Sequence, residues 1–123
     1  MIKLTFCLRR KPGLSLGEFQ DYWLNKHGPL VRSFAQDLRI QRYVQLHSYD
    51  DPMNIGMAKA RNAPPAYDGV AQLWFNSLDD LKENARSDAG RRADQTLLED
   101  EAKFIDLENS PLWFGEEQVI VGD

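Results

Sequence analysis

The feature that most constrains the fold of this chain is the way its hydrophobic spacing switches between two periods. Apolar and polar residues alternate over 2–9, which is typical of a strand with one buried face. Over 16–38 the apolar residues instead recur every three or four positions, as on an amphipathic helix. Alternation returns over 40–49, and a strand that is apolar on both faces apart from Gln72 follows at 70–75, which fits a central position. The first half therefore predicts a strand, a helix and two further strands.

The rest of the chain repeats the order of helix and strand. Ser77 begins a second helix, and Ser87 begins a further turn. Short apolar runs at 104–107 and 117–121 predict two more strands, the last near a sheet edge. The complete order predicts an α+β, ferredoxin-like βαββαβ fold with one antiparallel sheet. Both helices then lie on one face of the sheet, so a second copy of the chain is expected to cover the other face.

Length and composition fit one ordinary globular domain that spans residues 1–123, with 42% hydrophobic and 28% charged residues. No run of about 18 apolar residues is present, so no membrane span is expected. The net charge of −4 argues against a surface for nucleic acid or anionic membranes. The basic residues near the N-terminus follow the apolar run, which is the wrong order for a secretory signal. Because the single Cys7 cannot form an internal disulfide, we expect a cytoplasmic protein.

A long connection joins the second and third predicted strands. Residues 50–68 contain three prolines and one glycine, and 54–61 are compatible with a short helix. Compact domains rarely keep a connection of this length without a function such as a lid. We therefore expect residues 50–62 to be more mobile than the strands that they join.

His27 interrupts the apolar stripe of the first helix, directly before a Gly28-Pro29 pair. Pro29 cannot donate to the carbonyl of Asn25, and its ring crowds that turn, so the helix is expected to kink or restart there. A kink above a sheet opens a gap, which Trp23 and strand side chains would line as a pocket. Two interpretations of His27 stay open: a buried ring that donates to a free carbonyl at a helix end, or a functional residue in a pocket.

The other candidate residues also have ordinary structural explanations. Asp68 precedes the central strand and fits a turn carboxylate. His47 fits a pocket residue, an exposed residue or a dimer contact, and Trp74 fits the core. Two distant histidines without paired cysteines do not fit a zinc site. A nucleophile pair of Cys7 and His27 is disfavoured, because a strand gives Cys7 no helix N-terminus to activate it.

Motifs along most of the chain point to one family. They are Arg10-Lys11-Pro12-Gly13-Leu14-Ser15, Glu18-Phe19, Tyr22-Trp23, His27-Gly28-Pro29-Leu30, Tyr67-Asp68-Gly69-Val70-Ala71 and Trp74-Phe75. In this order, over most of residues 1–107, they resemble the EthD-like proteins of the dimeric α/β-barrel superfamily. The resemblance implies a homodimer whose two sheets close into a barrel, with a pocket between helices and sheet in each subunit. Relatives include cofactor-free isomerases of lactones and polyketide enzymes that dehydrate or decarboxylate.

The resemblance also implies roles for individual residues. The family histidine corresponds to His27, and the motif aspartate to Asp68. We therefore predict a cofactor-free enzyme, without a metal, of the isomerase, dehydratase or decarboxylase type. His27 would be the general acid or base toward a small cyclic carbonyl or aromatic compound, and Asp68 would orient the ring or the substrate. The expected ligand-binding residues are Trp23, Tyr43, His47 and Trp74. Two alternatives stay open: a non-catalytic protein that binds a small hydrophobic molecule or assists another enzyme, and a purely structural dimer.

Overall fold

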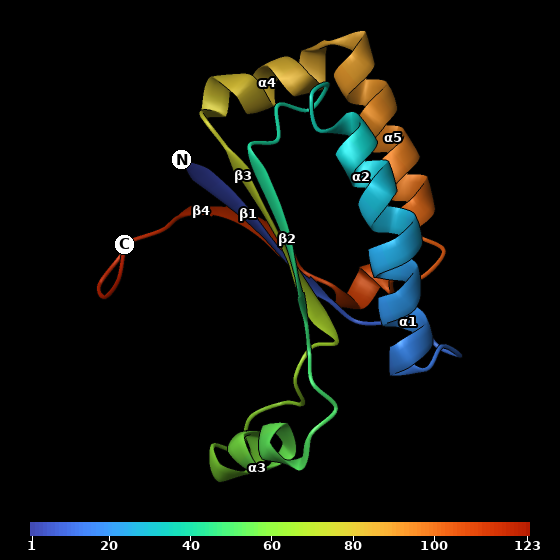
Figure 1. Cartoon of the computed structure of the whole chain (residues 1–123), viewed down its shortest axis with the longest axis vertical. Helices are drawn as coiled ribbons and strands as arrows, with labels where there is room; N and C mark the ends of the chain where they lie inside the picture. Colours follow the sequence, from blue (N-terminus) through green and yellow to red (C-terminus); the bar gives the residue numbers. More distant parts are fainter.

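Four antiparallel strands form one sheet in the computed structural model, which describes residues 1–123 (Figure 1). The strands are β1 (Ile2–Leu8), β2 (Arg42–His47), β3 (Gly69–Phe75) and β4 (Leu112–Glu116). Their order across the sheet is β2-β3-β1-β4, so β3 is central, as its apolar sequence predicted. With the helices on one face, this is the ferredoxin-like arrangement, and the predicted α+β fold class is confirmed.

The five helices are α1 (Leu16–Tyr22), α2 (Gly28–Phe34), α3 (Pro52–Ala60), α4 (Leu78–Arg86) and α5 (Asp88–Glu101). Three of them, α1, α4 and α5, begin directly after the serine residues that the sequence predicts as caps. Ser15 and Glu18 form the expected capping box at the start of α1. Ser77 and Ser87 cap α4 and α5 with their hydroxyl groups. The turn expected after Ser87 is therefore a full helix, and it packs against α4 and α2 on the helical side of the molecule.

The Gly28-Pro29 pair is accommodated by a π-helical turn over Trp23–His27, and the helix continues through it from α1 into α2. The backbone N–H of Gly28 donates to the carbonyl of Trp23, five residues earlier. Pro29 then occupies the start of α2, where its missing donor costs nothing. The expected kink is thus a local widening of the helix, and it sets the direction of the His27 side chain.

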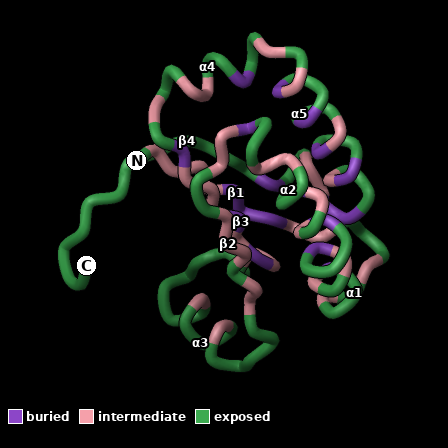
Figure 2. The backbone as a smooth tube through the Cα atoms, turned by 45° about the horizontal axis from the view of Figure 1, so that its top comes forward, coloured by how far each residue is buried: buried purple, intermediate pink, exposed green.

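Two of the predicted strands are wrong. Residues 104–107 form a turn with a single bridge between Arg10 and Ile105, followed by a short 3₁₀ helix at Leu107–Asn109. Their apolar character reflects burial in the core under the helices, where Phe104 is 1% exposed. The fourth strand is β4, which pairs with β1, whereas residues 117–121 form no strand. They lead into an exposed C-terminal end that extends away from the sheet (Figure 2).

The core lies between the helices and one face of the sheet. Its buried residues are Phe6, Leu8, Phe19, Trp23, Ala71, Phe104 and Ile105, with a second cluster of Val31, Leu38, Ala93 and Leu97. In β2 the polar-aromatic face points toward this core, and the aliphatic face points away from it. Tyr43 packs under the helices, whereas Leu46 is exposed on the opposite face. The sheet therefore keeps apolar side chains on the face that no helix of this chain covers.

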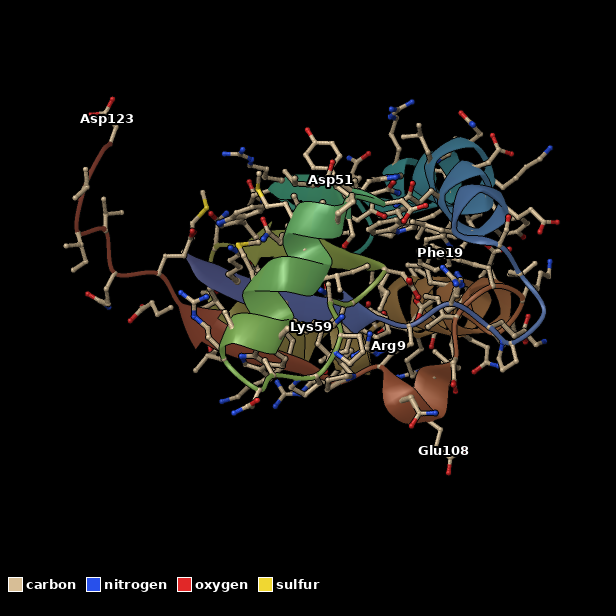
Figure 3. All side chains as sticks on the ribbon, turned by 90° about the horizontal axis from the view of Figure 1, so that it is seen from below. Arg9, Phe19, Asp51, Lys59, Glu108 and Asp123 are labelled. Carbon is tan, nitrogen blue, oxygen red and sulfur yellow. The ribbon has the colours of Figure 1, made fainter.

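The long connection contains the expected short helix, α3, which starts two residues earlier than residue 54. It lies across the end of the sheet, apart from the helix that carries Phe19 (Figure 3), and none of its residues is buried. No helix of the chain has both the length and the apolar character needed to cross a membrane.

Candidate active site

Trp23 of the π-helical turn and Gly69 of β3 are in close contact beside the candidate site. Trp23 begins the π-helical turn and is 1% exposed. Its ring lies so near the first residue of β3 that a Cβ atom on Gly69 would lie far inside van der Waals distance. The indole also stacks on the imidazole of His47, with ring centroids 4.5 Å apart. The glycine of the Asp68-Gly69 motif thus has a packing role, because only glycine allows this approach.

His27 points from the π-helical turn toward α5 and is 5% exposed. Its Nδ1 atom lies 2.7 Å from Oδ2 of Asp100, and its ring packs against Phe104. The hydroxyl of Tyr22 donates to Oδ1 of the same carboxylate over 2.6 Å, and the ammonium of Lys103 lies 3.5 Å from that oxygen. The histidine is therefore held by a side-chain carboxylate, and the helix-end carbonyl that sequence reasoning considered as its partner does not bind it.

The charges in this cluster determine which nitrogen of His27 carries the proton. Burial by itself raises the pKa of Asp100, but hydrogen bonds from Tyr22 and His27 outweigh it and hold that pKa below its usual value. An ionised carboxylate only accepts hydrogen bonds, so Nδ1 is the protonated nitrogen. Burial also lowers the pKa of His27, and Asp100 offsets part of that effect. Near neutral pH the ring is thus neutral, with its lone pair on Nε2.

Nε2 of His27 borders a cavity of about 460 Å³ between the helices and the sheet. Every fully buried polar side-chain atom in the chain has a hydrogen-bond partner. Nε2 has none, so it is not sealed within the packing and instead reaches the cavity that His27 helps to line. Of the 22 lining residues 18 are hydrophobic, so the cavity suits an apolar ligand. Leu98 of α5 and Leu112 and Phe114 of β4 line it while about half exposed, which marks its mouth.

Tyr43 and Glu101 bring two further ionisable groups to this cavity. The phenolic oxygen of Tyr43 accepts a hydrogen bond of 2.8 Å from Nε2 of Gln45, so the phenol proton stays available to donate. Burial raises the pKa of Tyr43, which keeps that proton in place. Burial, together with the charges of Asp94 and Asp100, raises the pKa of Glu101 to about 7.

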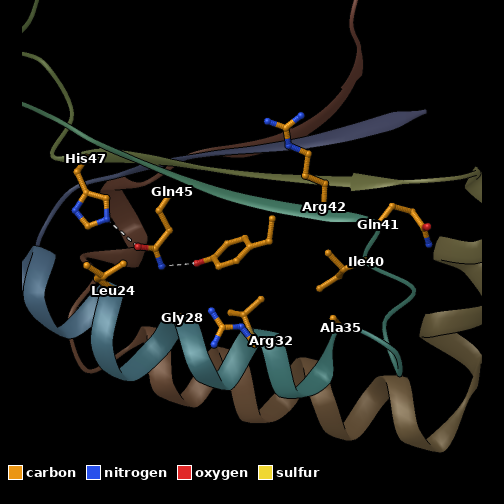
Figure 4. A pocket seen from close by; sticks show the side chains of 11 residues that line it. Leu24, Gly28, Arg32, Ala35, Ile40, Gln41, Arg42, Gln45 and His47 are labelled. Atoms are coloured by element: carbon orange, nitrogen blue, oxygen red, sulfur yellow. Dashed lines mark hydrogen bonds between the residues drawn. The ribbon is translucent and has the colours of Figure 1, made fainter.

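A second hollow of about 500 Å³ runs between α2 and β2 (Figure 4). Val31, Ile40 and Tyr43 line both hollows and so form the wall between them. Figure 4 shows His47 bound to the amide of Gln45 on this side, with Nε2 of the imidazole 2.8 Å from Oε1. His47 is therefore linked to Tyr43 through Gln45, outside the cavity of His27.

Two of the predicted site residues lie apart from His27. Asp68 accepts hydrogen bonds from the backbone N–H of Arg10 at 2.7 Å and from its guanidinium at 3.3 Å. Asp100, and not Asp68, therefore orients the His27 ring. Trp74 lies on the uncovered face of the sheet, where its indole N–H donates to Glu117 and the ammonium of Lys3 lies over its ring. It does not line the cavity, whereas Trp23 and Tyr43 do.

Sequence reasoning missed Asp100 and Glu101, and only Glu101 could have been found from the sequence. The apolar stripe of the last helix continues through Ala93 and Leu97 at a spacing of four. Its next position is Glu101, which therefore interrupts an apolar face in the same way as His27 does in the first helix.

Comparison with known proteins relates this arrangement to one family. Residues 11–108 match the family model described as the EthD domain. "Decarboxylase dmxR15" of Cryptosporiopsis sp. (strain 8999) is 25% identical over 122 residues, which cover 91% of this chain and 77% of that protein. "Conidial pigment biosynthesis dehydratase EthD" of Metarhizium robertsii is 26% identical over 118 residues, which cover 94% of this chain and 81% of that protein.

Solved structures support the fold. An EthD family protein of Bacillus halodurans C-125 superimposes with a TM-score of 0.63 at 20% identity, covering 96% of this chain and 99% of that one. A dimeric protein of unknown function with a ferredoxin-like fold, from Bacteroides fragilis NCTC 9343, gives a TM-score of 0.58 at 11% identity. That superposition covers 94% of this chain and 95% of that one.

Proposed function

We propose that this chain, which belongs to the EthD domain family, is a cofactor-free enzyme for acid/base chemistry on a small hydrophobic carbonyl or aromatic compound. One observation carries the proposal. Nδ1 of His27 is bound to Asp100, which leaves Nε2 as a basic atom at the edge of an apolar cavity. The names of two relatives, a decarboxylase and a dehydratase, are compatible with a lyase reaction.

The groups around the cavity supply the steps of a proton abstraction. Apolar walls hold an aromatic ring away from water, and the Tyr43 hydroxyl donates to the carbonyl oxygen of the ligand. His27 then removes a proton from the carbon next to that carbonyl, and the electron pair moves into an enolate. Asp100 is a positioning residue in this scheme, because it fixes the tautomer of the ring and stabilises the imidazolium that forms.

A non-catalytic binding protein would need the same apolar cavity but no buried base. The carboxylate behind His27 favours the enzyme, because burying Asp100 and the imidazole has a desolvation cost that binding an apolar ligand does not require. The two functions differ in one measurable property, since only the enzyme exchanges protons with its ligand.

The uncovered face of the sheet supports a homodimer. Leu46 of β2 and Trp113 of β4 are 55% and 52% exposed there. A similarly folded protein from Bacteroides fragilis is described as dimeric. We therefore propose that a second copy of this chain covers the face and that the two sheets pack against each other.

Proton exchange tests the proposed enzyme. Small lactones and aromatic ketones are first screened for ligands that raise the melting temperature. Deuterium uptake at the α-carbon of a ketone such as 1-tetralone is then followed by NMR in D₂O. The parent should accelerate uptake, His27→Gln should reduce it to the buffer rate, and Lys26→Gln, an exposed change on the same turn, should retain it. A parent that binds ketones without exchanging their protons would be a binding protein.

A further inference from the structure

Glu101 is a cavity residue that the proton abstraction leaves unused. It is half-buried, lines the same cavity as His27 and makes no hydrogen bond or ion pair with any other side chain. Asp94, the other unpaired carboxylate of the lining, is exposed. A shielded carboxyl group without a protein partner is unfavourable when ionised, so its retention in an apolar cavity needs an explanation.

The backbone holds Glu101 in place at the end of α5. Its carbonyl accepts hydrogen bonds from the N–H groups of Phe104 and Ile105, which secures the last helical turn. The neighbouring Asp100 turns toward His27, while Glu101 follows Leu97 on the face that looks into the cavity. Its charge also acts on Tyr43, which donates to the carbonyl oxygen in the scheme above. His27, Tyr43 and Glu101 thus line one cavity.

The charge of the surroundings determines the form of this carboxyl group. Asp94 and Asp100 act on it through their charges, and the titratable side chains that share its cavity are His27, Tyr43 and Asp94. Burial and the two aspartates raise its pKa to about 7, so a large share of Glu101 is a neutral acid near neutral pH. A neutral carboxylic acid is a proton donor, whereas His27, which lines the same cavity, is a proton acceptor.

We propose that Glu101 is the general acid of this site and that its substrate class is an uncharged β-hydroxy ketone, which loses water. This inference rests on the proposed function. His27 Nε2 takes the proton from the carbon between the carbonyl and the hydroxyl-bearing carbon. The electron pair of that C–H bond forms the C=C bond, the C–O bond breaks, and the hydroxyl leaves as water with the proton of Glu101. The proton on His27 then returns to the Glu101 carboxylate through solvent, so no oxidant or reductant is needed.

The lining favours an uncharged substrate. Asp94 and, in its ionised fraction, Glu101 line the cavity, and no lysine or arginine lines it. A substrate carboxylate would therefore meet like charges without a cation to pair with. The same ketone with a carboxylate on its ring should give a smaller thermal shift than the uncharged ketone.

Two assays on one protein separate this inference from the proposed function. The first is deuterium uptake by 1-tetralone, which needs only the base. The second is formation of 1-naphthol from the β-hydroxy derivative of 1-tetralone, which needs the base and the acid. Glu101→Gln should keep the uptake and slow elimination by about 100-fold or more. Glu101→Asp should recover part of the elimination. Glu99→Gln, an exposed change two residues earlier in α5, should keep both activities.

The outcomes are distinct. Elimination at the parent rate in Glu101→Gln overturns the role of Glu101 and leaves His27 as base. Equal loss of uptake and elimination in Glu101→Gln shows that the residue is needed for structure, and also overturns the role. A parent without uptake overturns the proposed function, and this inference with it.

The acid form can also be checked without a substrate. In the folded parent Glu101 loses its proton near pH 7, whereas a glutamate in the unfolded chain loses it near 4.5. Between these values the folded state binds more protons, so the contribution of Glu101 to stability falls as the pH rises. Glu101→Gln should therefore gain melting temperature relative to the parent over this range. A constant difference between the two proteins contradicts a shielded neutral acid.

Discussion

The protonation of His27 depends on two opposing influences, burial and the carboxylate of Asp100. Asp100→Asn removes the negative charge and leaves the burial unchanged, so the pKa of His27 should fall further below 6.5. Titration of the imidazole by NMR measures this shift directly. Asp94→Asn, which changes a carboxylate of the cavity that does not contact His27, should leave the titration unchanged. A raised pKa of His27 in Asp100→Asn would contradict the assigned contact.

The contact between Gly69 and Trp23 predicts a steric effect on stability. Gly69→Ala should destabilise the protein by about 1–3 kcal/mol, because the added methyl group displaces a buried indole. Gly56→Ala is the matched control, since nothing lies within 4 Å of that position in α3. Alanine there should be neutral or stabilise by up to about 1 kcal/mol through helix propensity. Chemical denaturation measures both values, and equal effects would argue against the contact.

At the scale of single residues, the sequence locates His27 but not its partner. A polar residue in an apolar stripe is visible without a structure. Asp100, however, lies 73 positions away, and its pairing with His27 depends on how α5 is rotated against the first helix. Asp68 was a reasonable candidate from its motif, yet its actual partner, Arg10, comes from the chain just after β1.

At the scale of elements, regular helices were easier to predict from the sequence than irregular turns. The serine caps and the apolar period located the helices that carry them, but the π-helical turn is not visible in the apolar stripe, because a spacing of four fits both kinds of turn. The apolar run 104–107 was mistaken for a strand, since apolarity alone does not distinguish a buried turn from a strand.

The position of α3 predicts that it opens easily. None of its residues is buried, and Met53 and Met57 are exposed, so few contacts oppose local unfolding. Amide hydrogen exchange over 52–60 should be faster than over 69–75, the central strand. Equal protection of the two segments would mean that α3 is covered, for example by a second subunit.

At the scale of the whole molecule, the order of elements was sufficient for the topology, because few arrangements of this order bury both helices. The same order of elements places the helices on one face of the sheet, so the other face is uncovered. Sedimentation at micromolar concentration should therefore give a mass of twice 14.2 kDa. Leu46→Lys should weaken the dimer, whereas Leu78→Lys, an equally exposed leucine on α4, should not. A monomeric parent would contradict the assembly.

The central claim is that Nε2 of His27 removes a proton from a ligand in the cavity. The most direct test is the rate of deuterium uptake by 1-tetralone from about pH 5 to about pH 8, with the parent and with His27→Gln. Because the pKa of His27 lies below 6.5, the parent rate should rise with pH and reach a plateau, with its midpoint below that value. His27→Gln should follow the uncatalysed rate throughout. A folded His27→Gln protein that reproduces the parent profile would contradict the claim.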